Sequence, residues 1–245
     1  IFSTGSKGKI KTTSFIYYIL RESFRLSYIL GNIGNPMLAV LIKSIEPNAV
    51  LVIELSSYQL DDIKYSPDIA VVLNLFPDHM NYHGDIGKYY DAKHNIARFQ
   101  GNNDFFIYNG GYQELKSWAR NSFSRGIDFS IIKLPVQLET TLIGRHNLEN
   151  IKAAVAVART LAIPDKTIFS AIKKFKPLPH RLELIGQYRG IRFYDDAIST
   201  TPESTIAAVE SLREVGTIML GGEDRGYDFT KLEMVIRYFG IKNIV

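Results

Sequence analysis

Short unbroken apolar runs alternate along this chain with stretches in which apolar residues recur every three or four positions. Ala49–Ile53 and Ile69–Leu73 are the clearest runs, and polar or turn-forming residues bound each of them. Runs of this length predict strands that are buried on both faces. The segments 85–99, 146–161 and 166–175 instead have the spacing of helices with one apolar face. This alternation predicts an α/β fold with a mostly parallel sheet flanked by helices.

The same reading extends to the rest of the chain. Further strands are expected at 27–30, 104–108, 127–131 and 136–142. The proline-rich stretch Lys176–Pro179 predicts a domain boundary, which gives domains 1–178 and 179–245. Beyond the boundary the pattern restarts, with strands expected at 184–185, 191–194, 217–220 and from 241, and helices at 202–212 and 229–239. This second part reads as the start of another α/β domain.

Composition excludes several classes of protein. The 245 residues carry 29 basic and 25 acidic side chains, a net charge of +4 without a basic block, so charge indicates no nucleic-acid partner. There is no cysteine, which excludes disulfides and thiolate chemistry. No apolar run approaches the ~18 residues of a membrane span, so we expect no membrane partner. The chain starts at Ile1 and ends where a strand begins, so we expect a fragment of something longer.

A glycine-rich turn follows the first short strand. The segment Gly5-Ser6-Lys7-Gly8-Lys9 leads into a helical stretch. Strand, glycine-rich turn and helix is the context of a phosphate loop, because glycines let backbone N–H groups approach phosphates at a helix N-terminus. The spacing between the glycines is two residues rather than four, and Ile10 follows the lysine. An ordinary glycine-rich turn therefore stays an alternative.

Acidic, imidazole and amine groups follow or face the predicted strands. Glu54 ends the run 49–53, where open α/β sheets bind their ligands, although a carboxylate there can also cap the next helix. His79 follows the run 69–73 and is a candidate metal ligand or a loop histidine. Lys93 falls near the apolar face of helix 85–99, where a lysine either extends to solvent or is chemically altered.

A series of motifs in one order resembles the Mur ligases, the ATP-dependent amino-acid-adding enzymes of peptidoglycan synthesis. The resemblance extends from Gly5 to about Phe229. The motifs are Gly-Ser-Lys-Gly-Lys, Gly-Asn-Ile-Gly, Glu-Leu-Ser-Ser-Tyr-Gln-Leu, Asn-Leu-Phe-Pro-Asp-His, Tyr-x-x-x-Lys, Gly-Arg-His-Asn-x-x-Asn and Pro-His-Arg-x-Glu. Within the family, Glu-x-Ser-Ser-Tyr-Gln-Leu and Asp-Asp-Ala-Ile-Ser-Thr-Thr-Pro-Glu are most similar to the member that adds D-glutamate.

The resemblance implies a fold, a reaction and its cofactors. Residues 1–178 would form a P-loop-type ATPase domain, and 179–245 the first part of a Rossmann-like domain that binds the amino acid. The carboxylate of UDP-N-acetylmuramoyl-L-alanine would attack the γ-phosphate of ATP, and D-glutamate would displace phosphate from the acyl phosphate. Two Mg²⁺ ions and a carbamylated Lys93 would assist. The family further implies a cytoplasmic monomer.

The resemblance also assigns roles to single residues. Catalytic roles fall to Lys9, Glu54, His79 and Lys93, of which the last three would bind magnesium. Nucleotide contacts fall to Gly5, Ser6, Lys7, Gly8, Lys9, Asn32, Asn150, Arg181 and Asp196. Substrate contacts fall to Ser56, Thr200 and Arg225.

Two positions depart from the family pattern. Ile10 stands where the family has a magnesium-binding Ser or Thr, and an aliphatic side chain cannot coordinate a hard cation. Thr12 is about 200° around the helix and a poor substitute. Arg225 stands where lysine is usual. The domain that holds UDP and most of the third domain are also absent, so this fragment is expected not to turn over. A truncated or decayed ATP-binding module, a sibling Mur ligase and a folylpolyglutamate synthase remain alternatives.

Overall fold

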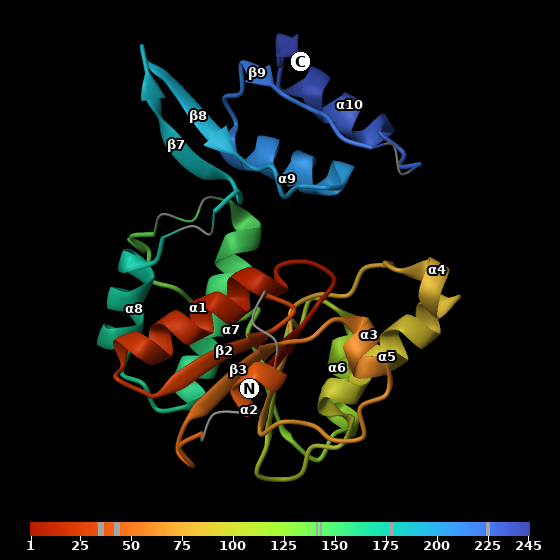
Figure 1. The fold of residues 1–245 in the computed structure, drawn as a ribbon, viewed down its shortest axis with the longest axis vertical. Coiled ribbons are helices and arrows are strands. Elements are labelled where there is room, and N and C mark those ends of the chain that lie inside the picture. The colour runs from red at the N-terminus through yellow and green to blue at the C-terminus, as the bar shows by residue number, and fades with distance from the viewer. Residues whose placement is uncertain (34–36, 42–44, 141, 143, 177–178, 224–225) are drawn as a thin grey trace. The chain divides into compact units, whose positions relative to one another are not determined.

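The computed structural model describes residues 1–245 except 34–36, 42–44, 141, 143, 177–178 and 224–225 (Figure 1). The chain divides into two compact units. One comprises Ile1–Thr140 and Glu149–Phe175, and the other comprises Thr141–Leu148 and Lys176–Val245. The domain boundary predicted after residue 178 stays a prediction, and Pro177 and Leu178 lie outside the described residues.

A six-stranded parallel sheet forms the centre of the first unit. Its strands are β1 (Phe2–Thr4), β2 (Ser27–Gly31), β3 (Val50–Glu54), β4 (Ile69–Val72), β5 (Phe105–Tyr108) and β6 (Arg125–Asp128). They lie in the order β2-β3-β1-β4-β5-β6, and every neighbouring pair is parallel. All four residues of β4 are buried, as the apolar run predicts. The predicted α/β class with a parallel sheet is therefore confirmed.

Helices cover both faces of this sheet (Figure 1). On one side lie α1 (Lys9–Glu22), α7 (Arg145–Thr160) and α8 (Asp165–Lys174); on the other lie α3 (Ser57–Asp61), α5 (Ile86–Arg98) and α6 (Gln113–Asn121). The short helices α2 (Leu38–Leu41) and α4 (Met80–His83) complete the set. Helix α1 packs on β2, β3 and α8, whereas α5 packs on β1 and β4. None of these described helices is long and apolar enough to cross a membrane.

The strand order creates a ligand-binding position at β1. From this central strand the chain first builds β2 and β3 on one side, and then β4 to β6 on the other. In open α/β sheets, ligands bind at the carboxyl ends of strands where the order reverses in this way. The predicted phosphate loop follows β1 at that edge, Glu54 ends β3 there, and the segment Asn74–His79 comes shortly after β4.

The second unit is smaller and contains two pairs of strands. β7 (Glu183–Tyr188) and β8 (Ile191–Asp195) form an antiparallel hairpin. β9 (Thr217–Ile218) and β10 (Asn243–Ile244) pair in parallel, and helices α9 (Pro202–Leu212) and α10 (Thr230–Tyr238) pack against each other. Thr201 caps α9, and Pro202 occupies its first turn, where its missing N–H costs nothing.

Two predictions about elements are wrong. No described residue of 136–142 is in a strand, and Val136 is fully exposed, so its apolar pattern finds no neighbouring strand. The strand predicted to reach Ile131 ends at Asp128, because Asp128 Oδ1 accepts the N–H of Ser130 and turns the chain. The sequence analysis did not predict helix α6, which is polar in overall composition and has Leu115 as its only buried residue.

Candidate active site

The predicted phosphate loop lies between β1 and α1. Gly8 has φ +82° and precedes the first residue of α1, a backbone conformation that favours glycine. A Cβ on Gly8 would lie 2.6 Å from Asn150 Oδ1. The loop therefore needs glycine here for two reasons, and Asn150 of α7 lies directly against it.

Lys9 folds back over this loop. Its Nζ donates to the carbonyl oxygens of Gly5 at 3.0 Å and of Ser6 at 3.3 Å. The first turn of α1, a helix of 14 residues, adds backbone N–H groups that the helix itself does not use. The ammonium and the helix N-terminus together give this end of the site a positive potential.

Glu54 is the last residue of β3 and is fully buried. Its carbonyl oxygen accepts the N–H of Asn32 at 3.2 Å, which brings the predicted γ-phosphate residue beside it. Gly31 permits this approach, since a Cβ there would lie 2.1 Å from the Glu54 carbonyl oxygen. The N-cap of α3 is Ser56, whose Oγ accepts the N–H of Gln59 at 3.3 Å. The interpretation of Glu54 as a helix cap is therefore wrong.

Lys93 extends from α5 to the underside of the phosphate loop. Only 1% of the residue is exposed, and Nζ donates to Gly5 O at 3.2 Å and to Thr4 Oγ1 at 3.3 Å. Nζ also lies 4.9 Å from the centre of the Tyr89 ring. Burial, and then the charge of Lys9, lower the pKa of Lys93 to about 7. The interpretation of Lys93 as a surface lysine that reaches for water is wrong.

His79 belongs to the same electrostatic environment. Burial lowers its pKa, and the positive charges of Lys9 and Lys93 lower it further, against the opposing effect of Asp78. Its backbone has φ +56°, which is uncommon for a residue other than glycine. The ring of Tyr58 lies 5.0 Å away. The structure thus brings together four predicted catalytic side chains: Lys9, Glu54, His79 and Lys93.

The donors at this edge only partly suit a magnesium ion. Glu54 supplies the carboxylate oxygens that Mg²⁺ prefers, and His79 supplies a nitrogen. No group of three or more His, Asp or Glu side chains that could hold a metal occurs among the described residues. An unmodified Lys93 ammonium would repel a cation. The set fits magnesium only if another oxygen donor, from the protein or from a ligand, joins Glu54.

Two threonines near Ile10 could replace the hydroxyl that a typical phosphate loop has after its lysine. Ile10 is half-buried, and Thr12 is fully buried. The Thr13 hydroxyl donates to the Lys9 carbonyl at 2.8 Å and lies 2.5 Å from Ser3 Oγ. Neither threonine presents a hydroxyl to solvent in place of the missing one.

The remaining predicted residues are spread over both units. Ser56 is occupied by its helix-capping bonds. In the second unit, Asp196 accepts the N–H of Leu182 at 2.8 Å and the hydroxyl of Ser199 at 2.5 Å, and Thr200 is exposed. Arg181 also belongs to that unit. Arg225 lies outside the described residues.

Sequence reasoning gave no role to two residues beside the loop. Asn74 exchanges hydrogen bonds with Lys7, and the Tyr89 hydroxyl lies 2.8 Å from Ser6 Oγ. Both belong to motifs that the sequence singles out, Asn-Leu-Phe-Pro-Asp-His and Tyr-x-x-x-Lys. The motifs signalled that these residues matter, but a contact between distant segments has no local signature.

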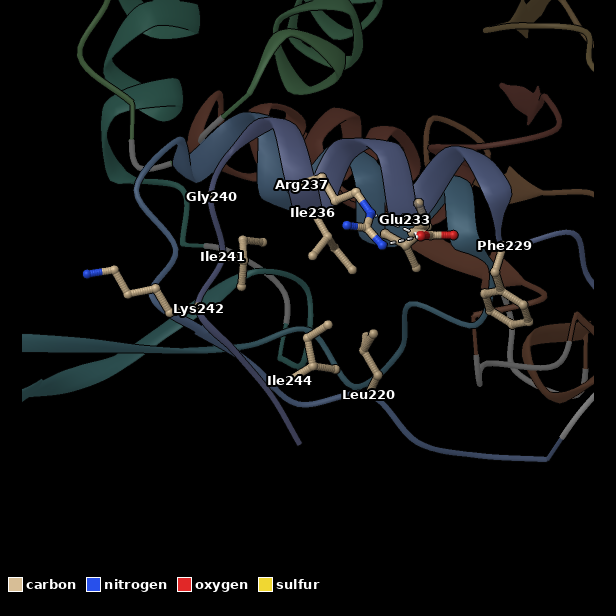
Figure 2. A pocket seen from close by; sticks show the side chains of 10 residues that line it. Leu220, Phe229, Glu233, Ile236, Arg237, Gly240, Ile241, Lys242 and Ile244 are labelled. Atoms are coloured by element: carbon tan, nitrogen blue, oxygen red, sulfur yellow. Dashed lines mark hydrogen bonds and ion pairs between the residues drawn. The ribbon is translucent and has the colours of Figure 1, made fainter.

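The second unit contains a hollow of about 740 Å³ beside α10 (Figure 2). Apolar side chains dominate its lining, among them Phe229, Ile241 and Ile244, while Glu233 and Arg237 pair with each other on α10. None of the described site residues predicted from the sequence lines it. It therefore offers no evident catalytic chemistry.

Comparison with known proteins gives consistent results. The profile of the family described as "Mur ligase middle domain" matches residues 4–135. A UDP-N-acetylmuramoylalanine--D-glutamate ligase from Thermosipho melanesiensis is 33% identical over 239 residues, which cover 96% of this chain and 54% of that protein. An equally named protein from Geobacillus sp. is 35% identical, with coverages of 94% and 55%. This chain thus spans about half the length of these relatives.

The fold has a counterpart among solved structures. The MurF ligase from Thermotoga maritima, determined in complex with ADP, superposes with a TM-score of 0.72 over 98% of this chain and 63% of that chain. The sequence identity is 18%, so this likeness concerns the fold alone.

Proposed function

Since this chain belongs to the Mur ligase family through its middle domain, we propose that it is the nucleotide-binding part of an ATP-dependent ligase. The reaction would join D-glutamate to UDP-N-acetylmuramoyl-L-alanine in peptidoglycan synthesis, in the cytoplasm and as a monomer. The names of the two relatives support this choice of substrates. The observation that carries the proposal is the meeting of Lys9, Glu54, His79 and Lys93 at the carboxyl edge of the sheet.

The phosphate loop would hold the triphosphate of ATP. Because Asn74 accepts the N–H groups of Ser6 and Lys7, the backbone N–H groups at the Gly8 end of the loop would face the phosphates, and Lys9 would turn from the Gly5 and Ser6 carbonyls toward phosphate oxygens. Asn32 and Asn150 would contact the nucleotide from β2 and α7. Contacts of Arg181 and Asp196 with adenosine, and of Ser56, Thr200 and Arg225 with the other substrates, rest on the resemblance alone.

The proposed reaction has two steps. A carboxylate oxygen of the first substrate bonds to the γ-phosphorus of ATP, and the bond to the β,γ-bridging oxygen breaks, which gives an acyl phosphate and ADP. The amine of D-glutamate then bonds to the acyl carbon, and phosphate leaves while the amine loses a proton. Negative charge develops on phosphoryl oxygens in the first step, where Lys9 and the N-terminus of α1 would stabilise it.

Lys93 is proposed to be carbamylated. The ammonium would first lose a proton, and the neutral amine would then bond to the carbon of CO₂ and lose a second proton, so a cation becomes an anion with two oxygens. A pKa near 7 supplies neutral amine at physiological pH, which an ordinary lysine does not. The carbamate would join Glu54 and His79 as a magnesium ligand, and two bound Mg²⁺ ions would neutralise phosphate charge.

The substrate assignment is tested with the complete reading frame that contains this sequence. Phosphate release from ATP should depend on UDP-N-acetylmuramoyl-L-alanine and D-glutamate, and not on L-glutamate, L-alanine or diaminopimelate. A preference for one of the other amino acids would instead indicate a sibling ligase.

Glu54→Gln tests the metal role of the carboxylate. The amide keeps the shape of the side chain and removes its charge, so we expect nearly unchanged melting and little ATP turnover. Retained turnover with a lowered melting temperature would make Glu54 a structural residue.

Lys93→Ala and carbon-13 bicarbonate test the carbamate. We expect a carbamate resonance in the NMR spectrum of the unaltered protein, none in the variant, and turnover that requires bicarbonate. A fully active, folded Lys93→Ala variant would refute the role.

A second candidate function is an ATP-binding module without ligase activity, which Ile10 favours. Replacing Ile10 with serine restores a hydroxyl at the first turn of α1. If the missing oxygen limits metal binding, Ile10→Ser should tighten Mg-ATP binding in calorimetry. Equal or weaker affinity would mean that Ile10 does not limit binding.

A further inference from the structure

Asn74, in the segment after β4, forms three hydrogen bonds with the backbone of the predicted phosphate loop. Asn74 Oδ1 accepts the N–H of Lys7 at 2.8 Å, and Asn74 Nδ2 donates to the Lys7 carbonyl at 2.9 Å. The Asn74 carbonyl also accepts the N–H of Ser6 at 3.2 Å. One asparagine thus pairs with consecutive loop residues much as a neighbouring strand would.

The hydrogen bonds between Asn74 and Lys7 restrain a part of the loop that glycines would otherwise make flexible. Lys7 lies between Gly5 and Gly8, and glycine loses more freedom on ordering than any other residue. Fixing both the N–H and the C=O of Lys7 leaves its peptide groups little room to rotate. The N–H groups that remain for a phosphate therefore keep one direction before any ligand arrives.

Ser6 provides a second attachment. Its Oγ donates to the Phe76 carbonyl at 2.9 Å, accepts the Phe76 N–H at 2.8 Å, and lies 2.8 Å from the Tyr89 hydroxyl. A serine hydroxyl has one proton, and Phe76 takes it, so Tyr89 must be the donor in the third bond. The one donor and two acceptor positions of the Ser6 hydroxyl are then all used.

We propose that Asn74 is a positioning residue that holds the phosphate loop in its nucleotide-binding shape, with Tyr89 as a weaker second support through Ser6. The same bonds connect the loop to the segment that carries His79, so they also fix the position of Lys9 relative to His79. The inference rests on the proposed nucleotide site, because it assigns the loop a phosphate ligand.

The test measures ADP binding to the 245-residue chain by calorimetry in magnesium chloride. Asn74→Ala removes both side-chain bonds to Lys7, and we expect the Kd for ADP to rise about tenfold. Tyr89→Phe keeps the ring under Lys93 and removes one hydroxyl, so about threefold is expected. Asn121→Ala is the matched control, since the exposed Asn121 side chain donates to Ser117 Oγ within α6, and it should leave the Kd unchanged.

Hydrogen exchange separates positioning from general stability. In Asn74→Ala, the amide of Lys7 should exchange at least about tenfold faster, while the amides of β4 and β5 keep their rates. Should Asn74→Ala not fold, Tyr89→Phe with faster exchange at Ser6 and weaker ADP binding carries the test. Unchanged ADP affinity in both variants, with binding by the unaltered chain, would overturn the inference and leave the nucleotide site standing. Absence of ADP binding by the unaltered chain would overturn the proposed function and the inference with it.

Discussion

The first unit buries a few ionisable groups within a large apolar core, whereas the second leaves most of its apolar residues at the surface. Lys93 and Glu54 lie inside the first unit, with fully buried neighbours such as Leu60 and Phe106. In the second unit, Leu184, Ile185 and Ile191 of the hairpin β7–β8 are more than half exposed. Burial is the main cause of the lowered pKa of Lys93. Shifted pKa values of this kind are therefore expected in the first unit, where side chains are buried.

The largest difference between the two units is expected in the stability lost when a glycine with positive φ is replaced by alanine. Gly31 has φ +101° and a neighbouring carbonyl 2.1 Å from where a Cβ would lie, so Gly31→Ala should cost about 4 kcal/mol or more. Gly190, in the turn between β7 and β8, has φ +82° and nothing within 4 Å, so Gly190→Ala should cost about 1–2 kcal/mol. Urea unfolding of both variants checks this. Similar losses of unfolding free energy in the two variants would mean that the backbone at Gly31 and Glu54 can shift to accommodate a Cβ.

The stability lost on replacing a leucine with alanine should differ between the two units nearly as much as the glycine substitutions do. Leu60 of α3 is fully buried in the core, and Leu60→Ala should cost about 3 kcal/mol through lost transfer energy and a cavity. Leu184 is 52% exposed, and Leu184→Ala should cost less than about 1 kcal/mol. The two unfolding curves, followed by circular dichroism, give the comparison directly. An equal loss at Leu184 would show that the hairpin is packed in solution.

Two histidines should respond to pH in opposite directions. Burial and then Arg98 lower the pKa of His94 to about 4, and its ring stacks on Trp118 at 4.5 Å. The folded state then resists protonation, so the stability of the first unit should fall as pH drops from about 6.5 to about 4. His94→Phe keeps an aromatic stack and should remove about 1–2 kcal/mol of that loss, a figure discounted for partial exposure.

His180 provides the opposite case. Its hydrogen bond to Asp195, at 2.7 Å, raises the pKa of the imidazole. That contribution is present below pH 6.5 and is lost as pH rises through the raised value. NMR titration of both imidazoles checks the pair of predictions, and a His94 that titrates near 6.5 would contradict the burial argument.

The smallest difference between the two units is expected in the stability that their exposed ion pairs contribute. Arg159 binds both oxygens of Asp165, at 2.9 and 2.8 Å, and Asp165→Asn should cost about 0.5 kcal/mol. Arg237 reaches a single oxygen of Glu233 on α10, so Glu233→Gln should cost less. Melting in low and high salt measures both, and salt should reduce each difference. A larger cost at Glu233 would reverse the ranking by geometry.

The sequence by itself determined the α/β class, the strands at β3 and β4, the helix α5 and the glycine-rich turn between β1 and α1. These follow from local patterns, since an unbroken apolar run or a helical repeat is written in consecutive residues. It also placed Lys9, Glu54, His79 and Lys93 as candidates, through motifs whose order resembles a family. The strand predicted at 136–142 failed because an apolar pattern forms a strand only where a partner strand is available.

Only the tertiary structure decided what these residues touch. The burial of Lys93 depends on Thr4 of β1 and on Gly5, which both lie beside its amine, and the sequence of α5 does not contain that information. The pairing of Asn74 with Lys7 joins residues 67 positions apart. Strand order sets both contacts, because it brings the ends of β1, β3 and β4 to one edge, and the pKa of a side chain follows from neighbours that the fold supplies.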